Sequence, residues 1–429
     1  MRFSTRRRLC RGAFVLLCLL PTVFVAGAAV VVHTPPYRAL RLAAWQSRLA
    51  DRLGLDVQLA SVEPQSGGTV ILGIELRDPE SHEWLVRIRS AEVTTSDLMT
   101  CVELGQPEIR YDRLTRLTEL LHERVLMRAG PREPVWQLEA PSLALRRDGQ
   151  APSLHNLQCV VDSRPEGTEL LVAFTVAGQA ADRRARLRVA RNRQIDPPAT
   201  GWELHTGSAD LLCSLGTVWF PGLGNLGDQC TFRGSIWAEQ GSDGWNADVA
   251  GTLRDMDLDH LVTSQFPHKL TGMAELVMHG VRMHQGRVVK ASGQLRCGGG
   301  AVSRSLLDAA ERALQLQHHA RAEDAPLLEY GQLALCFSLD DRNLTMSGPA
   351  DSPATIMADT QGPLLSVNQS QPVSPVDVLR MLVPHNDVHV PATRETAGLF
   401  RTLPLPRIAR SAARDARPTE YTPLRLRTR

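Results

Sequence analysis

The longest uninterrupted apolar stretch of the chain is residues 12–32, close to the N-terminus. In a helix that rises ~1.5 Å per residue, a stretch of this length spans about 30 Å, the thickness of the hydrocarbon core of a bilayer. The later sequence contains no second stretch of this kind. The pattern predicts a single transmembrane helix that anchors the chain.

Basic residues lie on one side of this stretch. Five arginines fall within the first eleven residues, and no acidic residue precedes Asp51. Because positive flanks stay on the cytoplasmic side of a membrane, we expect an inner-membrane, single-pass protein with most of its chain in the periplasm. The small residues Ala26-Gly27-Ala28 leave a cleaved signal peptide as the alternative. Both alternatives place the rest of the chain in the same compartment.

Beyond this stretch, apolar residues mostly alternate with polar ones, which is typical of β-strands with one apolar face. Close to the anchor, the apolar positions are Val70, Leu72, Ile74, Leu76, Val86 and Ile88. Farther along the chain, they are Val289, Leu295, Leu333, Leu335 and Phe337. We expect a mainly β (α+β) fold with an elongated, curved antiparallel sheet, and we expect these residues to line its apolar face.

A few segments have helical spacing instead. Leu42, Trp45, Leu49 and Leu53 recur at helical intervals and predict a helix over residues 37–53, ended by Gly54. Similar stripes predict helices over residues 114–127 and 305–318. These helices are short, so we expect them to accompany the sheet rather than form a helical domain.

Residues 350–429 show neither the alternation of a strand nor the spacing of a helix, and they are rich in Pro, Ser, Ala and Arg. This composition predicts a mostly disordered tail, with one short helix near residues 375–383. Asp196-Pro197-Pro198 marks a further boundary. The predicted regions are an Arg cluster and anchor (1–36), an N-terminal β-rich region (37–195), a C-terminal β region (196–349) and the tail (350–429).

Charge is distributed unevenly around a total of +2. Residues 394–429 hold nine arginines and three acidic residues, and the N-terminal arginines add to this excess. The body between the two basic ends is therefore acidic. Nucleic-acid binding requires clustered positive charge that neutralises phosphates, so we expect no nucleic-acid partner for the body.

Six cysteines follow the anchor at wide, irregular spacings with no CxxC motif, and the sequence does not choose among their pairings. The glycines of residues 222–227 match G-x-G-x-x-G, but no strand–turn–helix pattern surrounds them, so we expect a glycine-rich loop. Asp255, Asp257 and Asp259 resemble the start of a calcium loop without its Gly and Glu, and we expect one of them to cap a short helix.

Linear catalytic motifs such as HExxH, GxSxG and the Walker A sequence do not occur. No nucleophile, base and orienting group stand together in the sequence. We therefore predict a non-enzymatic protein with no cofactor and no metal site. A hydrolase whose site assembles only in space is the least favoured alternative.

Two regions of the chain, covering about 200 residues, resemble the AsmA-like family of bacterial envelope proteins. The similar strand and turn patterns lie at residues 54–62, 74–78, 90–93, 232–237, 251–259, 270–276, 286–295 and 344–348. The resemblance implies a membrane-anchored, elongated β protein related to repeating β-groove proteins, whose apolar concave face passes lipids between membranes. This chain is shorter than such bridges, so spanning an envelope would require a longer sheet or self-association.

The leading functional hypothesis is a membrane-anchored envelope protein that binds or helps move lipid, or supports outer-envelope assembly, through an apolar groove in its sheet. Its partners would be membrane lipids and other envelope proteins. The first alternative is an extracytoplasmic scaffold that binds partner proteins and has an ordinary closed core. An apolar face that helices leave partly uncovered favours lipid binding, and a fully covered face favours the scaffold.

Overall fold

A computed structural model of the chain describes residues 14–25, 34–65, 67–96, 98–127, 134–147, 153–241, 244–319, 325–367 and 372–383. Of the predicted anchor, residues 14–25 fall in this set and are helical, including the π-helical turn η1 (Val15–Leu19). No helix among the described residues is both long enough and apolar enough to cross a bilayer. The predicted Arg cluster and the tail beyond residue 383 lie outside the described residues.

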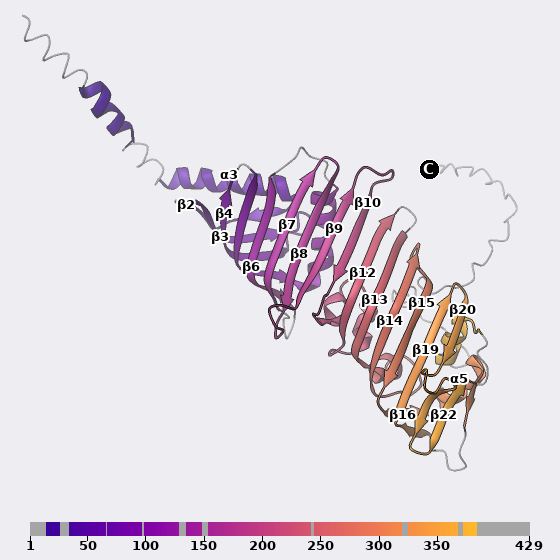
Figure 1. Cartoon of the computed structure of the whole chain (residues 1–429). Helices are drawn as coiled ribbons and strands as arrows, with labels where there is room; N and C mark the ends of the chain where they lie inside the picture. The colour runs from indigo at the N-terminus through magenta and orange to yellow at the C-terminus, as the bar shows by residue number, and fades with distance from the viewer. Residues whose placement is uncertain are drawn as a thin grey trace, which may run out of the picture.

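One sheet of twenty strands dominates the molecule, and a second sheet has two strands. Figure 1 shows the large sheet as a long, curved and twisted surface. The first part of the sheet consists of β1 (Asp56–Gln58), β2 (Ser61–Gln65), β3 (Gly68–Arg77), β4 (Trp84–Thr95), β5 (Met99–Arg110), β6 (Val135–Arg146), β7 (Ser153–Arg164), β8 (Gly167–Val176), β9 (Arg184–Asn192), β10 (Ala199–His205) and β11 (Leu211–Leu212). The prediction of a mainly β fold with a few short helices is therefore confirmed.

The second part of the chain continues the same sheet. Its strands are β12 (Thr231–Gly241), β13 (Gly244–Asp257), β14 (Met273–His284), β15 (Arg287–Cys297), β17 (Leu316–His318), β19 (Gln332–Asp340), β20 (Asn343–Ser347), β21 (Thr355–Asp359) and β22 (Gly362–Val367). The separate two-stranded sheet pairs β16 (Gly300–Ser303) with β18 (Leu327–Tyr330).

Neighbouring strands in the large sheet are mostly neighbours in the sequence. Strands β3 to β10, then β12 to β15, then β19 each pair with the next. The first edge is formed by β1 and β2, which both pair with β3. At the other end, β20 and β21 both pair with β19, and β22 joins β21 to β17.

The sheet is mixed, whereas an antiparallel sheet was predicted. Strands β5 and β6 run parallel, and parallel neighbours need a crossover connection. Here the crossover is helical and consists of η2 (Tyr111–Arg113), α4 (Leu114–Leu121) and the π-helical η3 (His122–Leu126). The helix predicted over residues 114–127 is thus present, and it helps to cover this part of the sheet.

A cluster of buried residues fills the space between these helices and the anchor-proximal strands. The predicted helix over residues 37–53 is α3 (Pro35–Leu53), and its C-terminal Gly54 adopts a φ of 65°. Leu42, Trp45, Leu49 and Leu53 of α3 pack against the cluster, which we call the proximal core. Asp78 is buried at the end of β3 and accepts a hydrogen bond from Arg116 of α4 at 3.1 Å, which ties the crossover to the sheet.

A larger cluster, the distal core, lies at the other end of the sheet. It contains buried residues of α5 (Arg304–Leu314), including Leu306, Leu307 and Leu314. Side chains of α6 (Pro375–Leu382) pack against the same cluster. In Figure 1 the helical segments of both halves lie behind the sheet, so one face carries the helices.

The predicted start of a disordered tail at residue 350 is wrong. Strands β21 and β22 and helix α6 lie beyond it, and Ile356 and Leu364 are only 4% and 2% exposed in the distal core. The two strands are five and six residues long, and register shifts interrupt their pairing, so no period of two stands out. The short helix predicted near residues 375–383 is confirmed as α6, which a capping box at Ser374 starts.

Pairing continues across the predicted boundary at residue 196. Strands β9 and β10 pair over seven residue pairs, from Ala199 with Asn192 to His205 with Arg186. The regions 37–195 and 196–349 therefore contribute to one continuous sheet.

Candidate functional site

Residues paired across neighbouring strands lie on the same face of a sheet, so the registers show which side chains form a row. One row runs through thirteen strands, from β4 to β20, and every member is apolar. Its members are Val93, Val102, Leu138, Cys159, Val172, Leu187, Leu204, Ile236, Val249, Val281, Ala291, Leu339 and Leu344. At ~4.8 Å between strands, this long apolar row extends over about 58 Å.

A second apolar row runs beside the first, two residues away along each strand. Its members are Trp136, Val161, Leu170, Val189, Trp202, Ala238, Ala247 and Met283. Since positions two apart share a face, the two rows form one apolar strip across the middle of the sheet. Trp245, two residues from Ala247, continues the same face and is 41% exposed.

The strip is unevenly covered. In the second row, Val189 is 1% exposed and Ala247 9%, whereas the neighbouring Leu170 and Trp202 are half-buried. In the long apolar row, Val102, Ala291 and Leu339 are 7–8% exposed. The members between them on β8 to β14 are only half-buried. Val172 and Leu204 pack against a small central cluster that contains Phe174 and Leu211, and Ile236 and Val249 pack against the distal core. Several other members of the strip pack against none of the four clusters of buried residues in the described part of the chain. They include Leu170, Leu187, Trp202, Val281 and Met283.

The predicted lining residues near the anchor divide between two environments. Ile74, Val86 and Ile88 are 7–9% exposed and belong to the proximal core, and Leu76 packs against it. These four side chains lie under helices and form a closed core.

Val70 and Leu72 do not share that face, which corrects the sequence prediction. Gly73 has a φ of 60°, and this left-handed residue reverses the alternation of β3. Before it, Ile71 (2% exposed) faces the proximal core, whereas Val70 and Leu72 are half-buried opposite Glu92 and Ser90. A Cβ atom at residue 73 would meet the Cβ of Ala60 at 2.7 Å, so glycine is also required for space.

Four of the five predicted distal residues share one face, and Val289 lies at a register shift beside them. Leu295 pairs with Leu335, and the adjacent positions of the same two strands pair Cys297 with Leu333 and Gly293 with Phe337. Leu333 is buried in the distal core, and Leu295 and Leu335 pack against it. Val289 and Phe337 are half-buried and pack against none of the described clusters. The distal set therefore passes from a closed core into the strip.

A polar cluster lies at one margin of the strip, under η3. Thr168, Arg191 and Thr200 form the next row across β8, β9 and β10. Arg191 donates a hydrogen bond to Thr200 Oγ1 at 3.0 Å, and His122 Nε2 lies 3.0 Å from the same oxygen. Burial, with the nearby charge of Arg191, lowers the pKa of His122 below its ordinary value. Because Arg191 already donates to Oγ1, the Thr200 hydroxyl donates its hydrogen bond to Nε2 of a neutral His122, and this bond fixes η3 to the sheet.

The strip also contains one thiol, that of Cys159. Burial raises the pKa of Cys159 to about 12, so its sulfur is a protonated, apolar part of the surface near neutral pH. Nucleophilic cysteines have lowered pKa values. The surroundings of Cys159 favour packing over covalent chemistry.

The aspartates of the calcium-like run have separate structural roles. Asp257 Oδ1 accepts a hydrogen bond from the amide of Asp259 at 2.9 Å, at the start of the π-helical η6 (Asp259–Thr263). Asp257 thus accepts hydrogen bonds from the first turn of η6, although the N-cap position itself is Leu258 and has no side-chain cap. Asp259 forms an ion pair with Lys269 at 2.8 Å. Both carboxylates thus have partners from the protein itself.

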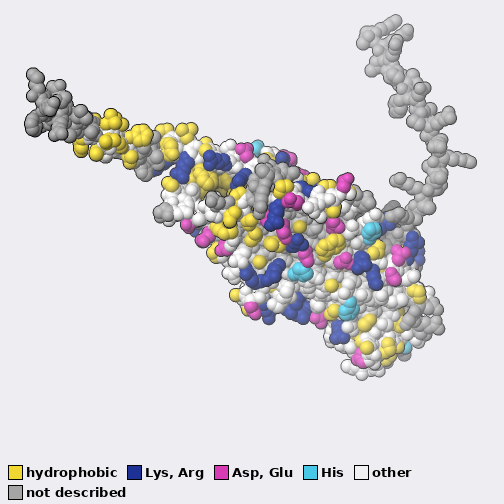
Figure 2. Space-filling model, turned by 45° about the horizontal axis from the view of Figure 1, so that its top comes forward, with side chains coloured by type: hydrophobic (Ala, Val, Ile, Leu, Met, Phe, Trp, Pro, Cys, Tyr) yellow, Lys and Arg dark blue, Asp and Glu magenta, His cyan; other side chains and the backbone are white. Residues whose placement is uncertain are grey.

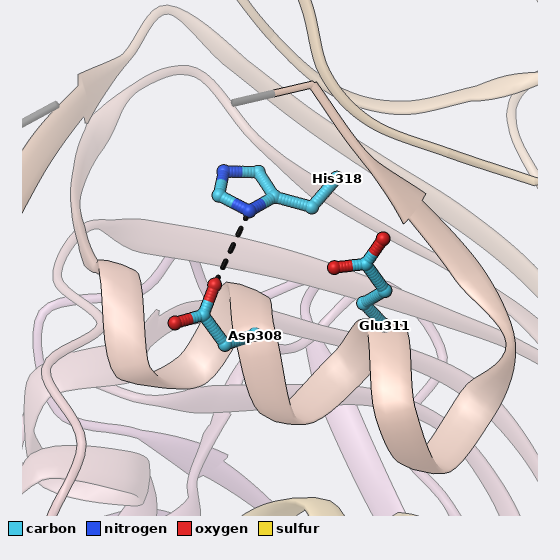
Figure 3. Close-up of side chains that lie close together, drawn as sticks. All are labelled: Asp308, Glu311 and His318. Atoms are coloured by element: carbon cyan, nitrogen blue, oxygen red, sulfur yellow. Dashed lines mark ion pairs between the residues drawn. The ribbon is translucent and has the colours of Figure 1, made fainter. Parts of the chain in front are cut away.

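One group of side chains in the described residues has ligand atoms close enough to hold a metal ion. Asp308 and Glu311 lie on α5 and His318 on β17, with one ligand atom of each within 4.8 Å of the others. Figure 3 shows His318 turned toward Asp308, and their Nδ1 and Oδ1 atoms are 3.3 Å apart. The His318 side chain is 3% exposed, while Asp308 is 45% exposed and Glu311 lies at the surface.

Nε2 of His318 is buried without a hydrogen-bond partner among the described residues. The contact between His318 Nδ1 and Asp308 Oδ1 has a structural role. It connects α5 to β17, and Glu311 remains a surface carboxylate. The prediction placed His318 at the C-terminus of a helix, but α5 ends at Leu314 and His318 belongs to a strand. The sequence therefore could not show that these three side chains meet.

Comparison of the chain with protein families, curated proteins and solved structures gave no match. The resemblance to AsmA-like proteins rests on the sequence patterns given above and stays a prediction.

Sequence reasoning missed the central residues of the strip. Alternation predicts strands at three of these residues, Leu187, Ile236 and Val249. It predicts no strand at Leu204, and the strand that contains Val281 extends farther than the alternation predicts. Alternation within one strand does not show which strands lie side by side, so the continuous row was not visible. The available signal was that all these strands are amphipathic, including those far from any predicted helix.

Proposed function

We propose that this chain is a membrane-anchored envelope protein that binds lipid on the apolar strip of its sheet. In this role it either helps move lipid or supports outer-envelope assembly. The observation that carries the proposal is the long apolar row, which crosses thirteen strands and is only half-buried at its centre. Acyl chains require a continuous apolar surface that is not already filled by the protein's own side chains.

The N-terminal segment supports a membrane location. Large apolar side chains of residues 14–25 are 49–74% exposed, and Figure 2 shows hydrophobic side chains gathered along this segment. Such exposed surface is costly in water and favourable in a bilayer. With the N-terminal arginines in the cytoplasm, the body lies in the periplasm, where membrane lipids and other envelope proteins are its partners.

A scaffold that binds proteins is the second candidate, because the ends of the sheet are closed. The proximal and distal cores are covered by helices, as in an ordinary globular domain. In that case the strip would be the surface on which a partner protein packs.

The deciding experiment places a charge in the strip. The full-length protein is extracted in detergent, and the lipids that co-purify are identified by mass spectrometry. We expect lipid on the wild type and at least a fivefold loss in Leu187→Asp, because an unpaired charge repels acyl chains. The matched control is Leu171→Asp on β8, whose side chain is 44% exposed on the opposite face and pairs with Arg188.

The outcomes separate the two candidates. Lipid loss in Leu187→Asp, with retained lipid in Leu171→Asp and a near-native melting temperature in both, supports the lipid surface. A wild type that carries no lipid, or equal lipid in all three proteins, contradicts it and favours the scaffold.

A further inference from the structure

Two buried cysteines face each other where the chain enters and leaves a long loop. Strand β11 pairs with β12 through Leu211 with Phe232 and Leu212 with Thr231. The next opposed residues are Cys213 and Cys230, and the Cys213 amide donates a hydrogen bond to the Cys230 carbonyl at 2.8 Å. Their Sγ atoms are 2.9 Å apart, and the two residues are 4% and 0% exposed.

We propose that Cys213 and Cys230 form a disulfide in the exported protein. Directly opposed residues of antiparallel strands bring their Cβ atoms within reach of a disulfide. Among the seven cysteines in the described part of the chain, this is the pair joined by a sulfur–sulfur contact. Cys297, by comparison, lies 3.4 Å from the hydroxyl of Tyr330.

The reaction is thiol–disulfide exchange with a protein disulfide, the class of oxidant that an exported chain meets. One cysteine thiolate attacks a sulfur of the oxidant, the oxidant's disulfide breaks, and a mixed disulfide forms. The thiolate of the second cysteine then attacks the mixed disulfide and releases the oxidant as a dithiol. The pair loses two electrons and two protons, and the oxidant gains them.

In the packed loop, the two thiols of the pair have different pKa values. A hydrogen bond from Cys213 lowers the pKa of Cys230, whereas the same pairing raises the pKa of Cys213. Both sulfur atoms are buried once the loop has packed. The exchange therefore takes place during folding, before the loop between residues 213 and 230 covers them.

The position of this loop gives the disulfide a structural consequence. The loop contains η4 (Cys213–Gly216) and η5 (Pro221–Leu226). Near its start, the hydroxyl of Tyr111 lies 2.7 Å from Thr217 Oγ1, and Thr115 donates to the Val218 carbonyl at 3.0 Å. Near its end, Leu226 packs against the distal core. A bond at the base of the loop fixes the element that contacts both the crossover helices and the distal half.

The test uses the full-length exported protein, denatured and treated with N-ethylmaleimide without reductant. Residues 194–233 form one tryptic peptide that holds both cysteines, because no Lys or Arg lies between Arg193 and Arg233. We expect this peptide to lack two hydrogen atoms and to resist alkylation until dithiothreitol is added. Alkylation of both cysteines without reductant would overturn the proposal.

Melting measurements test the consequence independently of lipid binding. Dithiothreitol should lower the melting temperature of the wild type by about 5 °C, because the open chain regains loop entropy. The Cys213→Ser/Cys230→Ser variant should melt at the reduced wild-type temperature and should not respond to dithiothreitol. Cys101→Ser, which removes a half-buried unpaired thiol, is the control and should respond like the wild type. A wild type that melts identically with and without reductant contradicts a role in fixing the loop.

Discussion

The ends and the centre of this sheet are built from similar strands but are covered differently. At the ends, the apolar face is packed under α3 and α4 or under α5 and α6, and its side chains are buried. At the centre, the same face continues through the long apolar row, but its members are half-buried. The stability of the molecule is therefore expected to come from the ends, and its binding capacity from the centre.

The variant with the largest expected effect on stability lacks the elements that pack on the distal end of the sheet. Truncation after Gly348 deletes β21, β22 and α6, which contribute Ile356, Met357, Leu364 and Leu365 to the distal core. Burial of each such side chain contributes roughly 1.5–3 kcal/mol, so we expect the distal half to lose cooperative unfolding, measured by calorimetry. Truncation after Val383 leaves every described element in place, and it should melt like the full chain.

A fragment ending at Gly348 that unfolds as cooperatively as the full chain would contradict this assignment. It would mean that β21, β22 and α6 rest on the distal core without stabilising it.

A second test compares two adjacent residues at the proximal end. Ile71→Asp places a carboxylate in the proximal core, where the native side chain is 2% exposed, and should cost about 4 kcal/mol of unfolding free energy. Leu72→Asp affects the opposite face, beyond the reach of that core, and should cost about 1 kcal/mol or less. Urea denaturation of both variants measures the difference. Equal losses would show that the reversal at Gly73 does not separate their environments.

This pair also shows how far the sequence predicts the fold. Alternation correctly predicts β3 and its neighbours as strands, because a half-buried strand needs one apolar face. It assigns Leu72 to the wrong face, because the reversal depends on a left-handed Gly73 packed against Ala60, 13 residues away in the sequence. A glycine within a strand pattern is compatible with a bulge but does not require one.

The candidate site is predicted only as a property of single strands. The residues Leu295, Leu335 and Phe337 do share a face, as their alternation predicts. The strip forms only if thirteen strands pair in the register that places their apolar side chains side by side. The residues that determine these registers are spread over some 250 positions of the sequence. Tertiary contacts also decide which part of the face is covered. Thus β21 and β22 contribute buried side chains to the distal core from a region whose composition predicts disorder.

The smallest expected effect is the change of the melting temperature with pH. This measurement compares His122, beside the strip, with His268, in the distal end. Burial lowers the pKa of both His122 and His268 from the ordinary value of 6.5. The unfolded chain therefore binds more protons than the native state as the pH falls through 6.5, and stability must fall with it. We expect the melting temperature to be constant above about pH 7.5 and about 2 °C lower per histidine at pH 5.5.

Two histidine variants show how much of the pH dependence of the melting temperature comes from the margin of the strip and how much from the distal end. His122→Gln keeps a polar atom near Thr200, where Nε2 now lies, and His268→Asn keeps one near Ser305, where Nδ1 lies. Each variant should remove about half of the pH dependence, and the double variant most of it. One alternative result is that only His268→Asn reduces the pH dependence of the melting temperature. In that case, η3 opens without affecting global unfolding, and the margin of the strip is as weakly packed as its centre. If the melting temperature rises on acidification, neither histidine is neutral in the native protein, and the assigned hydrogen bond from Thr200 to His122 is wrong.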